Sequence, residues 1–274
     1  MGLLQNASGK AFGEKIPEFT ECNRGHFFEN ETLPGVFCNS PNFNIIVVDN
    51  ASEDDSLSVL NKYINNIQLI KNPTNVGFAA AHNQLIPQLD TDYLWLLNTD
   101  TIFDHEIDVF NPIIKYLDQH PNVSGLSPKL LNTDGTVQPQ GGGLNQWVYH
   151  AKKTRKVSFL CGAALFIRTS FFIDIGGFDS RLFFYNDDFD FAKQSKRHNK
   201  QLIYFPSIQI THYGGGSSKC RPIDSQIAGY HGSIYLCHKF YSLPIFKLYY
   251  LIMRILIYLK TLYYTLHKDP TSAE

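Results

Sequence analysis

A short apolar run that stops at a polar cluster constrains the fold of this chain more than any other feature. Residues 93–97 read YLWLL, and Asn98, Thr99, Asp100 and Thr101 follow at once. An apolar run without alternation predicts a strand that is buried on both faces, as in the centre of a parallel sheet covered by helices. Ligands of such sheets bind beyond the carboxyl ends of the strands, so the sequence predicts a ligand site near Asp100.

Two interpretations of this polar cluster stand side by side. A hard cation such as Mg²⁺ or Mn²⁺ takes one or two carboxylates and completes its shell with phosphate oxygens and water, which would make Asp100 a metal ligand. Asn, Thr and Asp are equally favoured in turns and at helix caps, so the same residues also fit an ordinary turn. This stretch alone favours neither.

Strand and helix patterns alternate after the first 42 residues. Residues 43–49 predict a strand that ends on Asp49, residues 67–70 predict another, and Asn75 precedes a helix pattern. Repeated alternation implies right-handed crossovers and an α/β fold with a doubly wound, mostly parallel sheet. In such a sheet we expect Asp49, Asn75 and Asp100 to meet at one edge.

The chain divides into three parts by pattern. Residues 1–42 contain scattered apolar residues and several Gly and Pro without a sustained period, which predicts an irregular segment. Residues 43–240 predict the α/β domain, and residues 241–274 predict an apolar and basic C-terminal helix. With 43% hydrophobic residues among 274, the chain can bury a sizeable core.

The second half of the domain carries a dense group of acids. A long apolar strand is predicted from Val157 to Ile167, and Asp187, Asp188 and Asp190 open a helix further on. Acids in a first turn complement the helix dipole. Closely packed like charges also raise one another's pKa, so one of the three could be tuned as a base.

Two further strands are predicted after this helix, at residues 201–206 and 208–213. His212 lies at the end of the second and precedes a Gly-rich segment. A histidine at a strand end is usually structural, and ligation of a metal is the competing interpretation.

Charge and cysteine content exclude some classes of protein. The formal net charge is −1 and Lys and Arg form no dense block, so nothing predicts a nucleic-acid surface. Five cysteines without a C-x-x-C pair argue against a disulfide framework or a zinc knuckle. No secretory signal pattern is present, and we expect a cytoplasmic protein.

Taken together, the ordered motifs resemble family 2 of the nucleotide-sugar glycosyltransferases, with the GT-A fold, and especially its rhamnosyltransferase-like members. The resemblance covers roughly residues 44–218. Its landmarks are VVDNASEDDS, NPTNVGFAAAHN, LLNTDT, LCGAALFIRTSFF, IGGFDSRLFFYNDDFDF and THYGGGSS. Six motifs in this order make the resemblance specific.

The resemblance implies roles for individual residues. Asp188 would be the general base, and Asp100 the metal-bridging acid of a degenerate D-x-D motif, with His212 as a further metal ligand. The remaining residues that it implies are, on the donor side, Asp49, Asn75, Gly77 and Asn98, and, on the acceptor side, Asp187, Asp190 and Gly162. The family usually has Glu where this chain has Asp187.

The chemistry implied by the resemblance is sugar transfer with inversion. A divalent cation (Mg²⁺ or Mn²⁺) would neutralise the leaving diphosphate of a nucleotide-sugar donor, and a base would deprotonate the hydroxyl of a glycan or lipid-linked acceptor. Paired-carboxylate hydrolases need no nucleotide site, and sugar nucleotidyltransferases carry a Gly-rich basic loop near the N-terminus that has no counterpart here. Cell-surface polysaccharide synthesis is the expected context.

A non-catalytic sugar-nucleotide or glycan-binding relative is the rival hypothesis. Family members normally begin with an apolar strand that runs into Ser/Thr-Tyr-Asn, and its end forms one wall of the nucleotide site. Residues 1–42 contain no such stretch, so the first strand is expected to be missing or atypical. We expect weak donor binding as a result.

The C-terminal segment 243–266 is long and apolar but carries Lys247, Arg254 and Lys260. A spanning helix would place Arg254 near its middle, at a cost of at least about 2.5–3.5 kcal/mol. A helix in the interface could extend these cations toward lipid phosphates, whereas a helix that covers the domain needs no lipid. We favour peripheral attachment to the inner face of the cell membrane.

Overall fold

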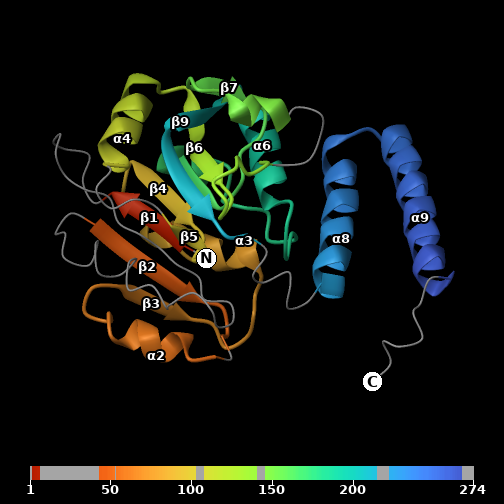
Figure 1. Ribbon diagram of the computed structural model, residues 1–274, viewed down its shortest axis with the longest axis horizontal. Helices are drawn as coiled ribbons and strands as arrows, with labels where there is room; N and C mark the ends of the chain where they lie inside the picture. The colour runs from red at the N-terminus through yellow and green to blue at the C-terminus, as the bar shows by residue number, and fades with distance from the viewer. Residues whose placement is uncertain are drawn as a thin grey trace.

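A computed structural model describes residues 2–6, 43–52, 54–102, 108–140, 146–214 and 222–266. These residues form an α/β domain and a pair of C-terminal helices beside it (Figure 1). The strands are β1 (Gly2–Asn6), β2 (Phe43–Asp49), β3 (Gln68–Lys71), β4 (Tyr93–Leu97), β5 (Thr101–Ile102), β6 (Val123–Leu131), β7 (Arg155–Val157), β8 (Ala164–Arg168) and β9 (Gln201–His212). The α-helices are α2 (Ser56–Asn61), α3 (Phe78–Asn83), α4 (Phe110–Gln119), α5 (Thr169–Asp174), α6 (Asp187–Arg197), α8 (Pro222–Phe240) and α9 (Leu243–Leu266).

All these strands belong to a single sheet in the order β3-β2-β1-β4-β8-β6-β9-β5, with β7 also on β9. The pairings show that β2, β3, β4, β6 and β9 point in the same direction, as the alternating pattern predicted. The strands β1, β5, β7 and β8 run against them, so the sheet is mixed. The carboxyl ends of β2, β4 and β9 therefore share one edge of the sheet.

The prediction that residues 1–42 are irregular is wrong for Gly2–Asn6. This segment forms β1 and pairs with β2 on one side and β4 on the other, so it occupies the position of the expected missing strand. Both pairings are antiparallel, with Gly2 opposite Val47 near the carboxyl end of β2. The five residues of β1 pair with residues 43–47 of β2 and residues 94–96 of β4. Residues 7–42 lie outside the described part.

The prediction of one strand from Val157 to Ile167 is also wrong. Arg155–Val157 pairs with β9, whereas Ala164–Arg168 pairs with β4 and β6. Residues 158–163 leave the sheet between them, and we call them the 158–163 loop. An apolar run cannot reveal such a break, because the loop buries Phe159 and Leu160 as a strand would.

Residues 201–212 form the single strand β9 where two strands were predicted. Its pairing with β6 shifts register between Pro128 and Lys129, so that Phe205 and Gln209 lie opposite neighbouring residues of β6. A bulge of this kind bends a strand without ending it. The bend carries His212 to the same edge as Asp100.

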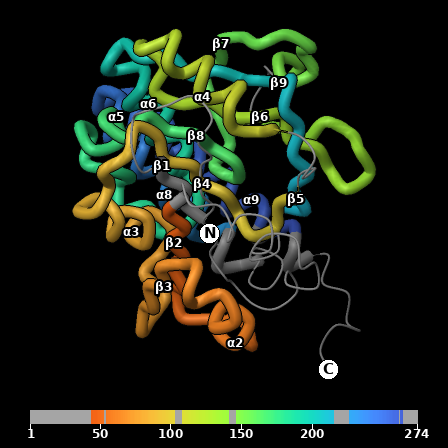
Figure 2. Tube along the Cα trace, turned by 90° about the vertical axis from the view of Figure 1, so that its left-hand side faces the viewer, coloured from red at the N-terminus to blue at the C-terminus, as the bar shows by residue number. Residues whose placement is uncertain are grey.

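Helices cover both faces of the sheet around a fully buried β4, which confirms the interpretation of YLWLL as a central strand. On one face Trp95 stacks on Phe166 at 4.5 Å and meets Phe110 of α4 edge-on at 5.1 Å. On the other face the ring of Phe191, from α6, packs closely against Gly125, where an added Cβ would lie 3.0 Å from that ring. In Figure 2, α4, α5 and α6 lie in the upper part of the view with β6 and β9, and α2 lies at the bottom beside β2 and β3.

The helices α8 and α9 lie side by side, and α8 lies between α9 and the domain (Figure 1). Several side chains fasten α8 to the domain. Lys239 forms ion pairs with Asp179 and Asp190, and Asn186 donates a hydrogen bond to the carbonyl of Gly229 at 3.1 Å. No helix in the described part of the chain is both long enough and apolar enough to cross a membrane.

Candidate active site

Asp100 and His212 meet where β4 and β9 end. The chain turns after Leu97, and Thr101 pairs with His212, so β5 holds the two side chains together. Nε2 of His212 lies 3.1 Å from Oδ1 of Asp100, and both side chains are largely buried. The backbone closes the same turn, because the amide of Tyr213 donates to the carbonyl of Asp100 at 2.8 Å.

Gln138 orients the imidazole of His212. Its Oε1 lies 2.7 Å from Nδ1 of His212, and its Nε2 donates to the carbonyl of the same histidine at 3.2 Å. In this arrangement Nδ1 carries the proton and donates to Gln138, which leaves a lone pair on Nε2. Nε2 is buried and makes no hydrogen bond.

A buried lone pair beside a carboxylate is the arrangement that a cation stabilises. A proton on Nε2 is one such cation: it faces Oδ1 of Asp100, and although burial raises the pKa of Asp100, this contact with His212 outweighs burial and lowers that pKa. The amide that holds Nδ1 is the kind of partner that fixes the tautomer of metal-binding histidines. Asp100 and His212 would, together with the oxygens of a diphosphate, make a donor set that suits a hard divalent cation.

Asp187 and Asp188 begin helix α6 at the same edge. Asp188 is half-buried, its Oδ1 accepts from the amide of Phe189 at 2.9 Å, and its carboxylate also accepts from the backbone of Gly162. Burial nevertheless raises the pKa of Asp188 to about 6. Burial and the charge of Asp188 raise the pKa of Asp187 well above its usual value. The pair can hold one proton near neutral pH, as a base requires.

Cys161 in the 158–163 loop connects the two acidic groups. Burial, and then the carboxylates of Asp188, Asp187 and Asp100, raise the pKa of its thiol to about 12. All three carboxylates therefore lie near this half-buried cysteine. The loop is also joined to the end of β4, since the amide of Asn98 donates to the carbonyl of Ala163 at 2.9 Å. Sequence analysis assigned no role to Cys161 or Gln138.

The predicted donor side lies at the end of β2. Asn50 follows Asp49 and is almost fully buried. Nδ2 of its side chain donates to Oδ1 of Asn75 at 2.8 Å, and its Oδ1 accepts from the backbone amide of Val76 at 3.0 Å. Oδ1 of Asn75 also accepts from the amide of Gly77 at 2.9 Å. The structure thus brings Asp49, Asn75 and Gly77 together through Asn50, a residue that sequence analysis did not select although it stands at the same strand end.

Of the remaining predicted residues, Asn98 and Gly162 lie beside the residues described above, whereas Asp190 contacts α8. Asn98 is half-buried in the turn before Asp100, where its carbonyl accepts from Thr101 at 2.7 Å, and Gly162 lies beside Phe78 and Asp187. Asp190 is turned toward Lys239 of α8 at 2.5 Å and takes part in fastening that helix.

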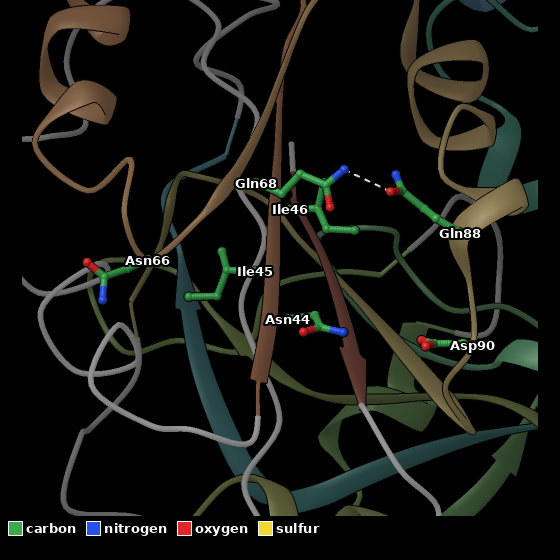
Figure 3. A pocket seen from close by; sticks show the side chains of 7 residues that line it. All are labelled: Asn44, Ile45, Ile46, Asn66, Gln68, Gln88 and Asp90. Atoms are coloured by element: carbon green, nitrogen blue, oxygen red, sulfur yellow. Dashed lines mark hydrogen bonds between the residues drawn. The ribbon is translucent and has the colours of Figure 1, made fainter.

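A cavity of about 250 Å³ lies away from these residues (Figure 3). Asn44 at the amino end of β2 and Asp90 before β4 line it, and Gln68 donates to Gln88 across it at 2.8 Å. It opens at the amino ends of the strands, opposite the edge that carries Asp100 and Asp188. The carboxyl edge therefore remains the candidate active site.

Known proteins share the sequence pattern of this chain. Residues 30–176 match the family model described as glycosyl transferase family 2, which is more than half of the chain. The N-acetylglucosaminyl-diphospho-decaprenol L-rhamnosyltransferase of Mycobacterium tuberculosis is 26% identical over 232 residues, covering 70% of this chain and 73% of that protein.

Solved structures share the fold. Staphylococcus aureus TarS 1–349 in complex with UDP-GlcNAc superposes with a TM-score of 0.50 at 17% identity, over 71% of this chain and 57% of that chain. The mannosyltransferase PcManGT of Pyrobaculum calidifontis, in complex with GDP-Man and Mn²⁺, gives a TM-score of 0.50 at 14% identity, over 78% and 71%. GalNAc-T7 with UDP, GalNAc and Mn²⁺ gives 0.50 at 16%, and this chain spans 37% of its length. These likenesses confirm the predicted GT-A fold.

Proposed function

Because this chain belongs to glycosyl transferase family 2, we propose that it transfers a sugar from a nucleoside diphosphate donor to a hydroxyl of a lipid-linked glycan, with inversion. The observation that carries the proposal is the shared carboxyl edge, where Asp100 and His212 face the 158–163 loop that also contacts Asp188. The relative from Mycobacterium acts on a decaprenol-linked acceptor by its name, which supports a lipid-linked acceptor here. Cell-surface polysaccharide synthesis would use such a reaction.

Asp100 and His212 are the residues that would hold a divalent cation, Mg²⁺ or Mn²⁺. Their buried Nε2 and carboxylate offer two donor atoms, and the donor's diphosphate would supply others. When bound, the cation neutralises charge on the departing nucleoside diphosphate. Mn²⁺ in the titles of two structures with this fold supports the assignment.

Asp188 would accept the proton of the attacking hydroxyl. A pKa of about 6 leaves its carboxylate ionised at neutral pH yet basic enough to take a proton. With a base and a stabilised leaving group, one displacement suffices and no protein nucleophile is needed, so the anomeric carbon inverts. Burial and the charge of Asp188 raise the pKa of Asp187, so Asp187 takes up a proton more readily than an ordinary aspartate, and this proton would remove a negative charge beside Asp188.

Binding of the two substrates would divide between the strand ends. Asp49, Asn75, Gly77 and Asn98 would contact the nucleotide, and Gly162 and Asp187 would lie on the acceptor side. Asp190 would support the acceptor side indirectly, since it pairs with Lys239.

The second candidate is a non-catalytic binding relative, and the direction of β1 favours it. Since β1 is antiparallel to β2 and β4, its amino end lies at the site edge, and it brings no Ser/Thr-Tyr-Asn segment there. Such a chain could retain sugar-nucleotide binding without turnover.

A panel of nucleotide sugars, assayed for release of nucleoside diphosphate with Mn²⁺ or Mg²⁺, tests the proposal. The wild-type chain should release product from at least one donor, Asp188→Asn should release it far more slowly, and the control Asp174→Asn, which removes an exposed acid of α5, should match the wild type. Absence of release from every donor, with sugar-nucleotide binding retained, would favour the binding relative.

A further inference from the structure

Helix α9 presents an aliphatic face that no described part of the chain covers. Its opposite face packs on α8, where Phe246 meets the ring of His238 at 4.9 Å and Met253 is buried. Lys260 of the same face donates to Gln226 of α8 at 2.6 Å. The outward face consists of Leu248, Leu251, Ile252, Ile255, Leu259 and Leu262, each of which is 40–61% exposed.

The spacing of these residues makes one continuous surface. They recur at intervals of three and four along a 24-residue helix, so they lie on one side over several turns. Contiguous exposed patches of this kind are rare on monomers and mark contacts with a protein or a membrane. Figure 1 shows α9 as the outermost element, separated from the sheet by α8.

The charges of α9 indicate which of these contacts it makes. The helix carries Lys247, Arg254 and Lys260 and no acidic residue. Lys247 and Arg254 are seven residues apart and border the aliphatic face on one side, with Tyr258 next to them. Basic groups and tyrosine at the margin of an apolar face match the headgroup level of a bilayer that contains anionic lipids.

We propose that α9 docks flat on an anionic lipid bilayer, with the aliphatic face in the acyl region and Lys247 and Arg254 at the lipid phosphates. A second copy of the chain fits the face less well, because two such helices would bring together cations without a matching acid. A spanning orientation would bury Arg254 in the middle of the bilayer, which is costly.

Hydrogen bonds between α8 and the domain would fix the position of the domain relative to the docked α9. Asn186, directly before Asp187, hydrogen-bonds to Gly229 of α8, and Ser233 of α8 donates to Asn186 at 3.3 Å. With α9 docked on the bilayer, α8 would therefore hold the first turn of α6, which carries Asp188, at a fixed distance from the membrane. If the proposed function holds, this brings the base toward a lipid-linked acceptor.

Co-flotation with vesicles tests the inference directly. The full chain should float with vesicles of phosphatidylcholine and phosphatidylglycerol and much less with phosphatidylcholine alone. Leu251→Glu/Ile255→Glu should lower the partition coefficient at least about tenfold, because both side chains leave the acyl region. Lys247→Gln/Arg254→Gln should lower it about 25-fold on anionic vesicles only, at about fivefold per charge.

The matched control is Ile64→Glu/Ile173→Glu, which makes the same chemical change at two exposed positions of the domain and should float like the wild type. Equal flotation of wild type and Leu251→Glu/Ile255→Glu, with unchanged circular dichroism, would overturn the proposal. So would a dimer in sedimentation experiments without lipid that this double variant dissociates. Release of nucleoside diphosphate, measured without vesicles, reports on the proposed function separately.

Discussion

Nζ of Lys239 lies 2.5 Å from Oδ1 of Asp190, and this pair joins the last turn of α8 to the first turns of α6. Asp179 accepts from the same ammonium group at 2.7 Å, and all three side chains are mostly buried. Asp190 is two residues from Asp188. Helix α6, which carries the proposed base Asp188, is thus held in place by α8, a helix that lies beside the α/β domain.

We expect Lys239→Met to lower the free energy of unfolding by about 3 kcal/mol, because it leaves two buried carboxylates without their shared cation. Denaturant unfolding at neutral pH measures this. Arg181→Met is the matched control, since Arg181 pairs with the same Asp179 but is 69% exposed, and it should cost less than about 1 kcal/mol. Equal effects of the two variants would show that the buried cluster does not fasten α8.

Asp188→Asn should lower the turnover number by about 10²–10⁴-fold while donor binding is largely kept. In the wild type, burial raises the pKa of Asp188 to about 6, so the base is protonated below this pH and ionised above it. Turnover should therefore fall as the pH drops through about 6 and level off above it. Initial rates between pH 5 and about 8 check this. A profile that is flat through pH 6 would exclude Asp188 as the base.

Asp100→Ala and His212→Ala should both weaken metal-dependent donor binding, because each removes one of the two proposed protein ligands. Gln138→Ala should weaken it by about 10–100-fold without removing a ligand, since Gln138 orients His212. Titration of Mn²⁺ in the presence of nucleoside diphosphate measures the change. His198→Ala, at an exposed histidine of the domain, is the control. Unchanged Mn²⁺ affinity in His212→Ala would return His212 to a structural role.

Gly77→Ala should cost about 3 kcal/mol or more of stability. Gly77 has a φ of 84°, and an added Cβ would lie 2.6 Å from the carbonyl oxygen of Phe183. Gly135 has a similar φ of 79° with nothing near its added Cβ, so Gly135→Ala should cost only about 1–2 kcal/mol. Thermal unfolding of both variants separates backbone strain from the clash. Equal costs would mean that Phe183 moves aside freely.

Nucleoside diphosphates should bind weakly to the chain as it stands. The antiparallel β1 satisfies the hydrogen bonds of β2 and β4, but its amino end faces the site edge. Calorimetric titration with uridine and thymidine diphosphates and Mn²⁺ tests this, beside a variant with an apolar strand ending in Ser-Tyr-Asn grafted before Phe43. The graft should tighten binding. Tight binding by the natural chain without a gain from the graft would contradict the prediction.

The sequence by itself determined the elements whose evidence is local. The unbroken apolar run of β4 predicted a buried strand, and the polar residues after it predicted a site at its carboxyl end. Asp100 and His212 were selected because each stands where a strand ends, whereas Asp188 was selected among three acids at a helix start by the resemblance to family 2. Asn50 stood at the same kind of position, next to Asp49, and could have been selected by the same rule.

Only the tertiary structure decided which of these residues meet and what each one contacts. The break after Val157, the pairing of Asp190 with Lys239 and the contact of Gln138 with His212 all depend on partners distant in the chain. The position of Gly2–Asn6 does too, because hydrogen bonds with β2 and β4 order a short segment that has no period of its own. Burial then set the pKa of Asp188, since desolvation depends on everything that surrounds a carboxylate and not on its neighbours in sequence.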